Sequence, residues 1–349
     1  MGKNETSRGM VIFSVSFYIV TALIMVFVNK WVLNKVSLPF TLLWFQVIVA
    51  VILLHLTNLF GILQLPIIEK QKCIGLLPLI LINILGLSFN TICLQYVDAS
   101  FYQVARALVL PFTVIFSYIF LNQKSSYKIL LSCLIVCVGF FVGVSSERLT
   151  ISIIGIIFGV CSSISTALHA IVIKKSLNVV KGNTMDLVYY NNFLSAIAFL
   201  PLIFLFGEQN QLLELFIKNT TTKQYSIEAK TFFIGILITG FFGFLINIAG
   251  FLQIKVTSPV THMISSAFRG VVQTILGYLL FSDILTTGRV GGIFLILFGS
   301  CVYTWFKDQE SKQFQNTSKF DKKVYDKLER GDSLDDDYDK IEIVEENEK

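Results

Sequence analysis

Two arginines lie inside apolar stretches of this chain, where a charged side chain needs a partner. Arg106 is in an apolar segment that runs from 99 to 121, and Arg269 is in one that runs from 258 to 281. A guanidinium left unpaired at bilayer depth costs at least a few kcal/mol, yet no apolar segment has an interior Asp or Glu. An anion that binds and is later released would supply the missing negative charge. The pattern therefore predicts a protein that carries anionic solutes across a membrane.

Each arginine also has a structural interpretation. Tyr102 lies four residues before Arg106, so the two would share one face of a helix and look into a central cavity. Arg106 could instead pair with Asp98, about two turns away, or reach the membrane interface. Arg269 could bond the carbonyl groups of a broken helix. The sequence leaves these alternatives open.

The segment that carries Arg269 begins with features of an anion site. Ser258 and Pro259 suit a helix start, where free backbone N–H groups favour an anion. Ser266 and Gly270 are small enough to let a ligand or another helix approach. A guanidinium can donate hydrogen bonds to two phosphate oxygens at once. We therefore expect Arg269 to meet a phosphorylated solute.

A polar cluster lies in a further apolar segment, from 187 to 206. Asn191 and Asn192 place two carboxamides there, and Ser195 adds a hydroxyl on the same helical face as Asn191. Each carboxamide offers two donors and an acceptor, which suits the edge of a guanine base. Hydrogen bonding between helices is the alternative, because membrane helices use such side chains routinely.

Composition places all of these residues in a membrane protein. Hydrophobic residues make up 54% of the 349, and the mean hydropathy is +0.71. A spanning helix needs about 20 mainly apolar residues. Windows of that length predict ten spans, at 10–30, 38–60, 74–95, 99–121, 129–146, 152–173, 187–206, 231–252, 258–281 and 288–306. The first run has no small-residue cleavage site, so we interpret it as a retained helix.

The ten spans divide into two copies of one half. A shift of 145 residues aligns Thr21 with Thr166, and a shift of 160 aligns Gly139 with Gly299. Five helices per copy is an odd number, so the second copy enters the membrane from the opposite face. The predicted fold is an all-α integral membrane bundle of two inverted five-helix repeats. Secondary transporters use this plan and hold their substrate near the midplane.

The expected regions follow from these repeats. They are a cytosolic N-terminus at 1–9, the two repeats at 10–146 and 152–306, and a cytosolic tail at 307–349. The tail carries nine basic and fourteen acidic residues, which predicts a disordered acidic extension. Lysines are more frequent in the loops that this topology leaves in the cytosol. Asn219 heads a glycosylation sequon in the longest loop on the opposite side.

Signatures of catalysis are missing from the sequence. It has no H-E-x-x-H, nucleophile elbow, P-loop or carboxylate pair inside a span, so we expect neither an enzyme nor a cofactor. Spans without acidic relays also argue against proton-driven pumping and favour exchange of anions. His55 and His169 are isolated, and the six cysteines have neither disulfide nor metal spacing, so no metal is expected.

Several phrases of the chain resemble nucleotide-sugar transporters of the drug/metabolite transporter superfamily, and more narrowly the GDP-fucose transporters of the Golgi. The similarity covers roughly residues 10–306. It rests on Val28–Lys30, Phe101–Arg106, Tyr190–Asn192, Leu252–His262 and Tyr303–Trp305. The Thr-Ser-Pro-x-Thr-His stretch that ends at His262 is the most specific of these phrases.

The resemblance implies contacts with a base. In the related GDP-mannose carriers, a Tyr-Asn-Asn-x-x-Ser motif binds guanine. It corresponds to four residues here, which are Tyr190, Asn191, Asn192 and Ser195. A tyrosine of the first helix that lines the family's pocket corresponds to Tyr18.

The resemblance also implies contacts with the phosphates and the sugar, and here the chain departs from the pattern. The Gly-Ala-Leu-Asn-Lys motif of GDP-mannose carriers is replaced by residues 266–270, Ser-Ala-Phe-Arg-Gly. GDP-fucose carriers have a lysine where this chain has Arg269, so the charge is kept and its geometry changes. The departure weighs against GDP-mannose. We expect Arg269 and Arg106 to meet the diphosphate, and Tyr102, Thr261, His262 and Ser266 to shape the pocket.

What the resemblance implies for function is alternating access that brings a GDP-sugar into the lumen of the Golgi, or of the ER, and returns GMP. A positively charged pocket is neutralised by either nucleotide but not when empty, so reorientation without ligand should be slow. The expected partners are GDP-fucose, GMP, the lipid bilayer and, as an option, a second copy of the chain, and not nucleic acid. The alternatives are GDP-mannose, another nucleotide sugar or a phosphorylated metabolite as cargo, or a non-transporting receptor or scaffold.

Overall fold

The computed structural model describes residues 8–146, 152–222, 227–256 and 259–330, and the regular elements in these ranges are helices. They are α1 (Arg8–Leu33), α2 (Pro39–Leu59), α3 (Lys70–Tyr96), α4 (Tyr102–Ala105), α5 (Val109–Leu121), α6 (Tyr127–Ser145), α7 (Ile153–Ser176), α8 (Thr184–Leu205), α9 (Glu208–Thr222), α10 (Ile227–Val256), α11 (Pro259–Phe281) and α12 (Thr287–Arg330). A helix pairs its backbone N–H and C=O groups within one segment, which is what apolar surroundings require.

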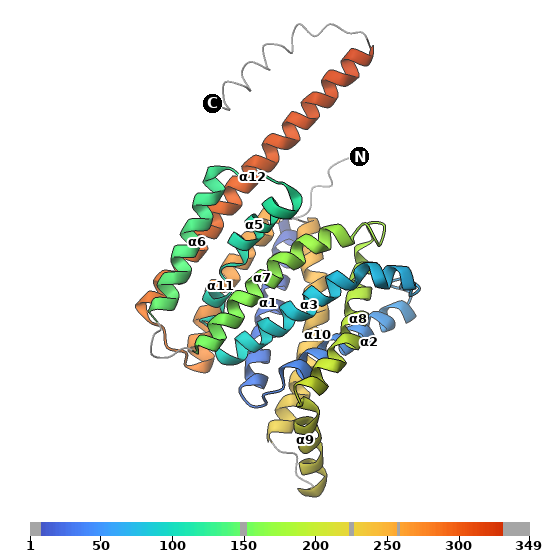
Figure 1. Cartoon of the computed structure of the whole chain (residues 1–349), viewed down its shortest axis with the longest axis vertical. Coiled ribbons are helices and arrows are strands. Elements are labelled where there is room, and N and C mark those ends of the chain that lie inside the picture. The colour runs from blue at the N-terminus through green and yellow to red at the C-terminus, as the bar shows by residue number, and fades with distance from the viewer. Residues whose placement is uncertain (1–7, 147–151, 223–226, 257–258, 331–349) are drawn as a thin grey trace.

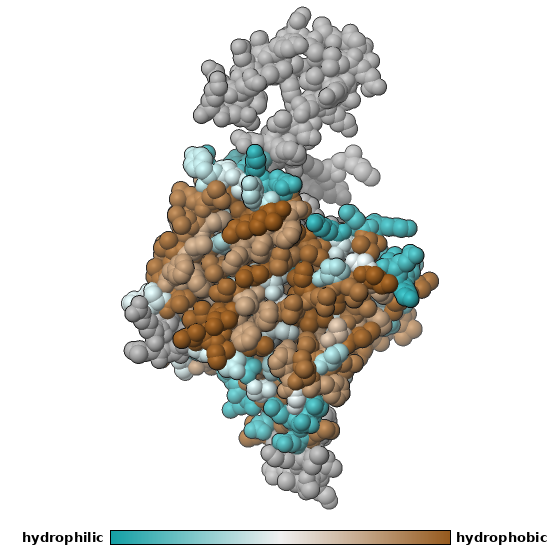
Figure 2. Space-filling view, viewed as in Figure 1, coloured by the Kyte–Doolittle hydropathy of each residue, from teal (hydrophilic) through white to brown (hydrophobic). Residues whose placement is uncertain are grey.

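Most of these helices suit a membrane. Within the described ranges, nine segments are long and apolar enough to span a bilayer. The remaining expected span, the ninth at 258–281, corresponds to α11, of which Phe268–Phe281 forms a shorter apolar helix. Figure 2 shows a hydrophobic band across the middle of one face of the molecule, with hydrophilic residues towards both ends. The all-α membrane fold class is therefore confirmed.

The contacts between helices have the symmetry of a duplicated unit. α3 packs along α7 as α10 packs along α1, while α6 packs on α12 and α2 packs on α8. Exchanging the first-half helices for their second-half counterparts leaves these pairings unchanged, as inverted repeats require. α1 begins and α12 ends at one end of the bundle, which we call the termini end (Figure 1). α9 lies at the other, which we call the α9 end.

Glycines bring α6 and α12 into backbone contact. A Cβ atom added at Gly139 would lie 2.9 Å from the Gly292 carbonyl oxygen, and one added at Gly292 would lie 2.7 Å from the Gly139 oxygen. One added at Gly299 would lie 3.0 Å from the Ser132 oxygen. Membrane helices use small residues in this way to approach each other closely. We call this contact the glycine seam.

Two helices differ from the sequence-based expectation. α9 occupies a region expected to be a loop, and its first residue, Glu208, explains why. The buried Glu208 carboxylate accepts hydrogen bonds from the backbone N–H groups of Phe40 (3.0 Å) and Thr41 (2.7 Å). It thereby satisfies the first turn of α2, which has no side-chain cap of its own. Burial raises the pKa of Glu208 above its ordinary value, against the opposing effect of these hydrogen bonds.

The second difference concerns the C-terminal region. The sequence predicted that the last span ends at 306 and that a disordered tail follows, but α12 continues as helix to Arg330. The charged residues beyond 306 are good helix formers, and Lys307 pairs with Glu310 one turn later at 3.3 Å. The prediction was therefore wrong for 307–330, and residues 331–349 lie outside the described ranges.

Candidate functional site

The fourth expected span is broken at Arg106. α4 ends at Ala105, Arg106 to Leu108 form a turn, and α5 begins at Val109. Pro111 gives the cause: proline lacks an N–H, and its ring clashes with the carbonyl group four residues earlier in a continuous helix. In the first turn of a new helix the missing N–H costs nothing. The break therefore places an arginine in a turn at membrane depth.

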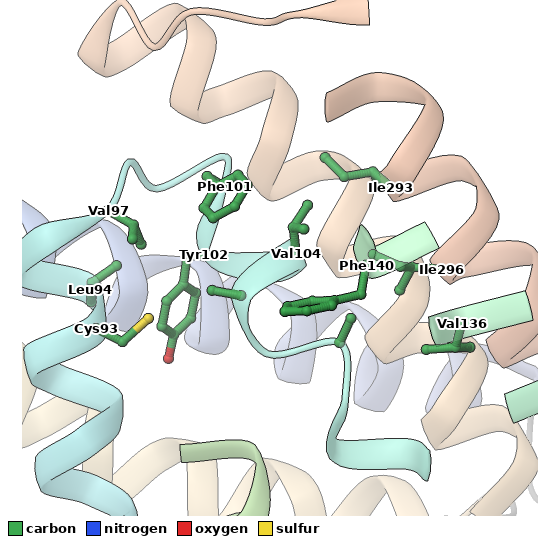
Figure 3. Close-up of a cluster of buried hydrophobic side chains, with 12 residues drawn as sticks. Cys93, Leu94, Val97, Phe101, Tyr102, Val104, Val136, Phe140, Ile293 and Ile296 are labelled. Atoms are coloured by element: carbon green, nitrogen blue, oxygen red, sulfur yellow. The ribbon is translucent and has the colours of Figure 1, made fainter. Parts of the chain in front are cut away.

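A hydrophobic cluster holds the short α4 in place. Four residues are too few for a stable helix in isolation. Phe101, Val104 and Ala105 are completely buried, and they pack against side chains of α6 and α12 that include Val136, Phe140, Ile293 and Ile296. Figure 3 shows the Tyr102 ring beside Cys93 and Leu94 of α3, with its hydroxyl group turned away from Phe101. Packing thus fixes where Tyr102 and the Arg106 turn lie.

Arg106 meets hydroxyl groups and an aromatic ring. Its Nη1 donates to the Tyr102 hydroxyl oxygen at 3.2 Å and its Nη2 to Thr166 Oγ1 at 3.4 Å. The guanidinium carbon lies 5.4 Å from the centroid of the Tyr102 ring. The Nε atom is buried and has no hydrogen-bond partner among the described residues. These contacts orient the guanidinium without neutralising its charge.

The suggested pairing of Arg106 with Asp98 is wrong, because Asp98 pairs with Arg289. Arg289 is completely buried, and its Nη2 lies 3.2 Å from Asp98 Oδ2. Its Nη1 donates to Ser100 Oγ at 2.6 Å, and the Ser100 backbone N–H donates to Asp283 Oδ2 at 2.8 Å. Burial raises the pKa of Asp283, although the hydrogen bonds from Ser100 oppose the rise. We call Asp98, Ser100, Asp283 and Arg289 the ionic cluster.

A third buried cation has a structural role. Lys30 Nζ donates to three backbone carbonyl oxygens, those of Leu94 (2.9 Å), Gln95 (3.3 Å) and Val97 (2.7 Å). These are among the carbonyl groups left without partners where α3 ends. A cation at a helix C-terminus also interacts favourably with the helix dipole. Lys30 therefore secures α3 beside the loop that leads into α4.

Arg269 lies on the side of α11 that faces the α4 segment. One turn later, Gln273 donates to the Ala99 carbonyl oxygen at 2.8 Å. A Cβ atom added at the neighbouring Gly270 would lie 3.0 Å from Cδ of Gln103. The Arg269 side chain is only partly exposed, and its Nε is buried without a hydrogen-bond partner among the described residues. Arg106 at the end of α4 and Arg269 on α11 thus both belong to the surroundings of the α4 segment.

The expected base-binding residues have unlike surroundings. Tyr190 is completely buried, and its hydroxyl donates to the Ile67 carbonyl oxygen at 2.8 Å, so it has no surface to offer a ligand in this structure. Asn192 Nδ2 donates to the carbonyl oxygen of Val188, one turn earlier, at 2.9 Å. Asn191 is partly exposed, but its Oδ1 is buried and has no partner in the described part of the chain.

Ser195 is completely buried and accepts a hydrogen bond from Asn83 Nδ2 at 3.2 Å. Asn192 borders a small, mostly apolar cavity between α2, α8 and α10, with Ala50, Leu54, Val188, Phe244 and Ile248. Asn191 and Asn192 therefore have different neighbours, as expected for adjacent residues of a helix. The structure brings Tyr102 and Arg106 together, but it does not join Tyr190 to them.

The remaining expected site residues are partly outside the description. Tyr18 is buried in α1. Thr261, His262 and Ser266 are in α11, and their side chains are not described. Asn219 is in α9, and its side chain is likewise not described. Within the described ranges, no three His, Cys, Asp or Glu side chains form a group that could hold a metal ion.

Comparison with known proteins identifies the family. The sequence profile of the Triose-phosphate Transporter family matches residues 9–304. The chain belongs to this family. It is 34% identical over 308 residues to GDP-fucose transporter 1 of Dictyostelium discoideum, covering 86% of this chain and 81% of the relative. It is 32% identical over 323 residues to the Drosophila melanogaster protein named GDP-fucose transporter, Golgi, covering 88% and 93%.

A solved structure supports the same fold for this Triose-phosphate Transporter family member. It has 12% sequence identity, covers 87% of this chain and 99% of its own, and superimposes with a TM-score of 0.52. At that identity the likeness concerns the fold alone. The named relatives are transporters, and this chain is accordingly a membrane transporter rather than an enzyme.

Sequence analysis did not identify Asn90, Ser162 and Thr166. Asn90 Oδ1 accepts hydrogen bonds from the Tyr102 hydroxyl and, at 3.4 Å, from Ser162 Oγ. Thr166 contacts Arg106 directly. The available signal was that these residues are polar and lie within the predicted spans 74–95 and 152–173. It is a weak signal, because Ser and Thr are common in membrane helices and usually bond their own backbone.

Proposed function

We propose that the chain exchanges nucleotide sugars for nucleotide monophosphates, and that GDP-fucose entering the Golgi lumen against GMP is its principal reaction. The observation that carries the proposal is the Arg106 site. A guanidinium at membrane depth has hydroxyl partners, an unpaired Nε and no carboxylate among the described residues. A diphosphate supplies the missing negative charge.

The identity of the cargo is inferred from relatives. Proteins named GDP-fucose transporters are 32–35% identical to the chain over most of its length, and the Drosophila name includes the Golgi. Asn191 supports a guanine contact, because its buried carboxamide oxygen has no partner among the described residues. Guanine offers donors at N1 and N2 to such an acceptor. Asn192 and Ser195 belong to the same helix, α8, and we include them in the proposed base site, although Ser195 would first have to be uncovered from Asn83. Tyr18, Thr261 and His262 would shape the pocket.

Alternating access would use the charge of the site as its coupling device. An empty site carries one or two positive charges that the chain does not neutralise, and exposing them to the apolar interior during reorientation is costly. GDP-fucose or GMP neutralises these charges, so only the loaded carrier reorients rapidly. Strict exchange follows from this difference in energy.

Uptake into proteoliposomes tests the proposal. Vesicles preloaded with GMP should accumulate labelled GDP-fucose, and vesicles without GMP should accumulate far less. In parallel reactions, unlabelled GDP-mannose and UDP-galactose compete with labelled GDP-fucose. Their inhibition of its uptake shows how strongly the carrier selects for the sugar and for the base. Equal competition by UDP-galactose would refute the guanine site. Failure of every nucleotide to raise the unfolding temperature of the purified protein would favour a non-transporting receptor or scaffold.

Orientation is a separate part of the proposal. We place both termini in the cytosol, which puts the α9 end and Asn219 in the lumen. Treatment with a glycosidase should then increase the electrophoretic mobility of the protein expressed in eukaryotic cells, and an Asn219→Gln variant should not respond. A tag at the C-terminus that is protected from protease in sealed Golgi vesicles would contradict this orientation.

A further inference from the structure

Asn90 determines which way the hydrogen bonds around Arg106 run. Its Oδ1 accepts the hydroxyl hydrogen of Tyr102 and is also approached by Ser162 Oγ at 3.4 Å. A tyrosine hydroxyl has a single hydrogen. Because that hydrogen is donated to Asn90, the Tyr102 oxygen presents its lone pairs to Arg106 Nη1, 3.2 Å away. Asn90 on α3 therefore positions a guanidinium that it does not touch.

The residue type at this position matters as much as its geometry. An aspartate has nearly the same shape as asparagine and its oxygens accept the same two hydroxyl groups. It would, however, place a full negative charge one hydroxyl group away from Arg106. Opposite charges at such a separation attract strongly in surroundings of low dielectric constant. An amide provides the positioning and leaves the cationic charge uncompensated.

We propose that Asn90 positions Arg106 for nucleotide binding through Tyr102 and, as a neutral amide, leaves its charge uncompensated, so that exchange stays obligatory. This inference rests on the proposed function and adds the residue that sets its coupling. A carboxylate at position 90 takes the place of the visiting phosphate, so the empty carrier can reorient. The same carboxylate repels nucleotides, so their affinity falls.

Efflux measurements on the Asn90→Asp variant test the inference. Proteoliposomes are preloaded with labelled GMP, and efflux is followed into medium with and without GDP-fucose. Net efflux into nucleotide-free medium requires the empty carrier to return. For the wild type, external GDP-fucose should accelerate efflux at least about tenfold, which corresponds to about 1.4 kcal/mol of barrier. For Asn90→Asp, the ratio of the two rates should fall to about one, because efflux without GDP-fucose increases.

Three further variants separate charge from shape. Thr166→Asp brings a carboxylate to Arg106 from α7 instead of α3, since Thr166 Oγ1 lies 3.4 Å from Nη2. It should lower the ratio in the same way and covers the case in which Asn90→Asp does not fold. Tyr102→Phe removes the connection without adding charge, so GMP should bind less tightly while the ratio stays at the wild-type value. Asn83→Asp adds the same charge two turns earlier on α3, beside Ser195, and should also preserve the ratio.

The outcomes distinguish this inference from the proposed function. A wild-type protein that shows no nucleotide flux at all refutes the proposed function. A wild-type protein that exchanges GMP for GDP-fucose, with carboxylate variants that fold and keep the wild-type ratio, refutes the role of Asn90 alone. A ratio near one for Asn83→Asp would refute it as well, because any added charge would then suffice.

Discussion

Arg289 and Arg106 flank the same short helix, α4, and they are satisfied in different ways. Each guanidinium lies over an aromatic ring of that segment, Arg289 at 5.5 Å from Phe101 and Arg106 at 5.4 Å from Tyr102. Each also bonds a hydroxyl group. Arg289 has in addition the carboxylate of Asp98 at 3.2 Å, whereas Arg106 has no carboxylate in the described part of the chain.

The difference shows how to tell a structural cation from a functional one. A buried charge that the chain neutralises contributes to folding, and removing one partner leaves the other uncompensated. A buried charge that the chain only orients is costly to the empty protein and is relieved by a ligand. Residue type does not separate these cases, since both residues are arginines. The presence or absence of an acidic partner does.

Replacing Arg289 should produce the largest effect, on stability. Arg289→Met leaves Asp98, Ser100 and Asp283 without their cation at the α9 end. We expect the free energy of unfolding to fall by about 3 kcal/mol, at the lower end of the range for breaking a buried pair, because Asp98 is partly exposed. Thermal unfolding in detergent measures this change. An unchanged unfolding temperature would mean that the ionic cluster contributes little.

Replacing Arg106 should not lower the stability of the ligand-free protein, in contrast to replacing Arg289. Arg106→Gln keeps a polar group beside Tyr102 and removes the uncompensated charge, so the unfolding temperature without ligand should stay the same or rise. Affinity for GMP and GDP-fucose should fall by about 2 kcal/mol, roughly thirtyfold, as expected for a lost charge-assisted hydrogen bond. Ligand-induced thermal shifts report both quantities. A destabilised empty protein with intact affinity would place Arg106 in the same class as Arg289.

Replacing Arg269 by lysine should have a smaller effect. Arg269→Lys keeps the charge beside the α4 segment and loses the two-pronged contact with phosphate. Affinity for nucleotides should fall by about 1 kcal/mol, while Arg269→Ala should cost more for GMP and GDP-fucose alike. Unaltered GMP binding by Arg269→Ala would remove this residue from the phosphate site and leave Arg106 as its sole arginine.

The smallest effect concerns the pH dependence of stability. Burial raises the pKa of Asp283 above its ordinary value of 3.8. The folded protein therefore binds a proton more tightly than the unfolded chain does, and stability falls as pH rises from 3.8 through the raised value. Asp283→Asn keeps an acceptor for the Ser100 N–H and has no charge to titrate. Its unfolding temperature should change less with pH over that interval, and a wild-type slope in the variant would contradict the assignment.

The sequence predicted the helices better than their interruptions. Hydropathy locates a span because about 20 apolar residues suffice to cross a bilayer, and the inverted repeat followed from spacing. The break at Arg106 was not predicted, although Pro111 was the signal for it. A proline within an apolar run is compatible with a kink, a break or a helix start, and the choice among these depends on which neighbours pack around it.

The candidate site was predicted in part. The four-residue spacing of Tyr102 and Arg106 indicated their contact correctly, because it depends only on local helix geometry. Tyr190 was assigned to a ligand by resemblance, and the structure has its hydroxyl on the Ile67 carbonyl group instead. The Asp98–Arg289 pair joins residues 191 positions apart. Such pairs depend on the packing of whole repeats, which single-sequence patterns do not contain.

The glycine seam holds α6 and α12 in a fixed position relative to each other, so this helix pair can serve as the reference for measuring movement of the other helices. Each backbone there occupies the space that a side chain would need, so sliding by one residue would drive a bulkier neighbour into a peptide group. Probes attached to the outer faces of α6 and α12 should keep one separation whichever nucleotide is bound. Distances from either probe to the other helices then report their rearrangement directly, because the two labelled helices do not move relative to each other.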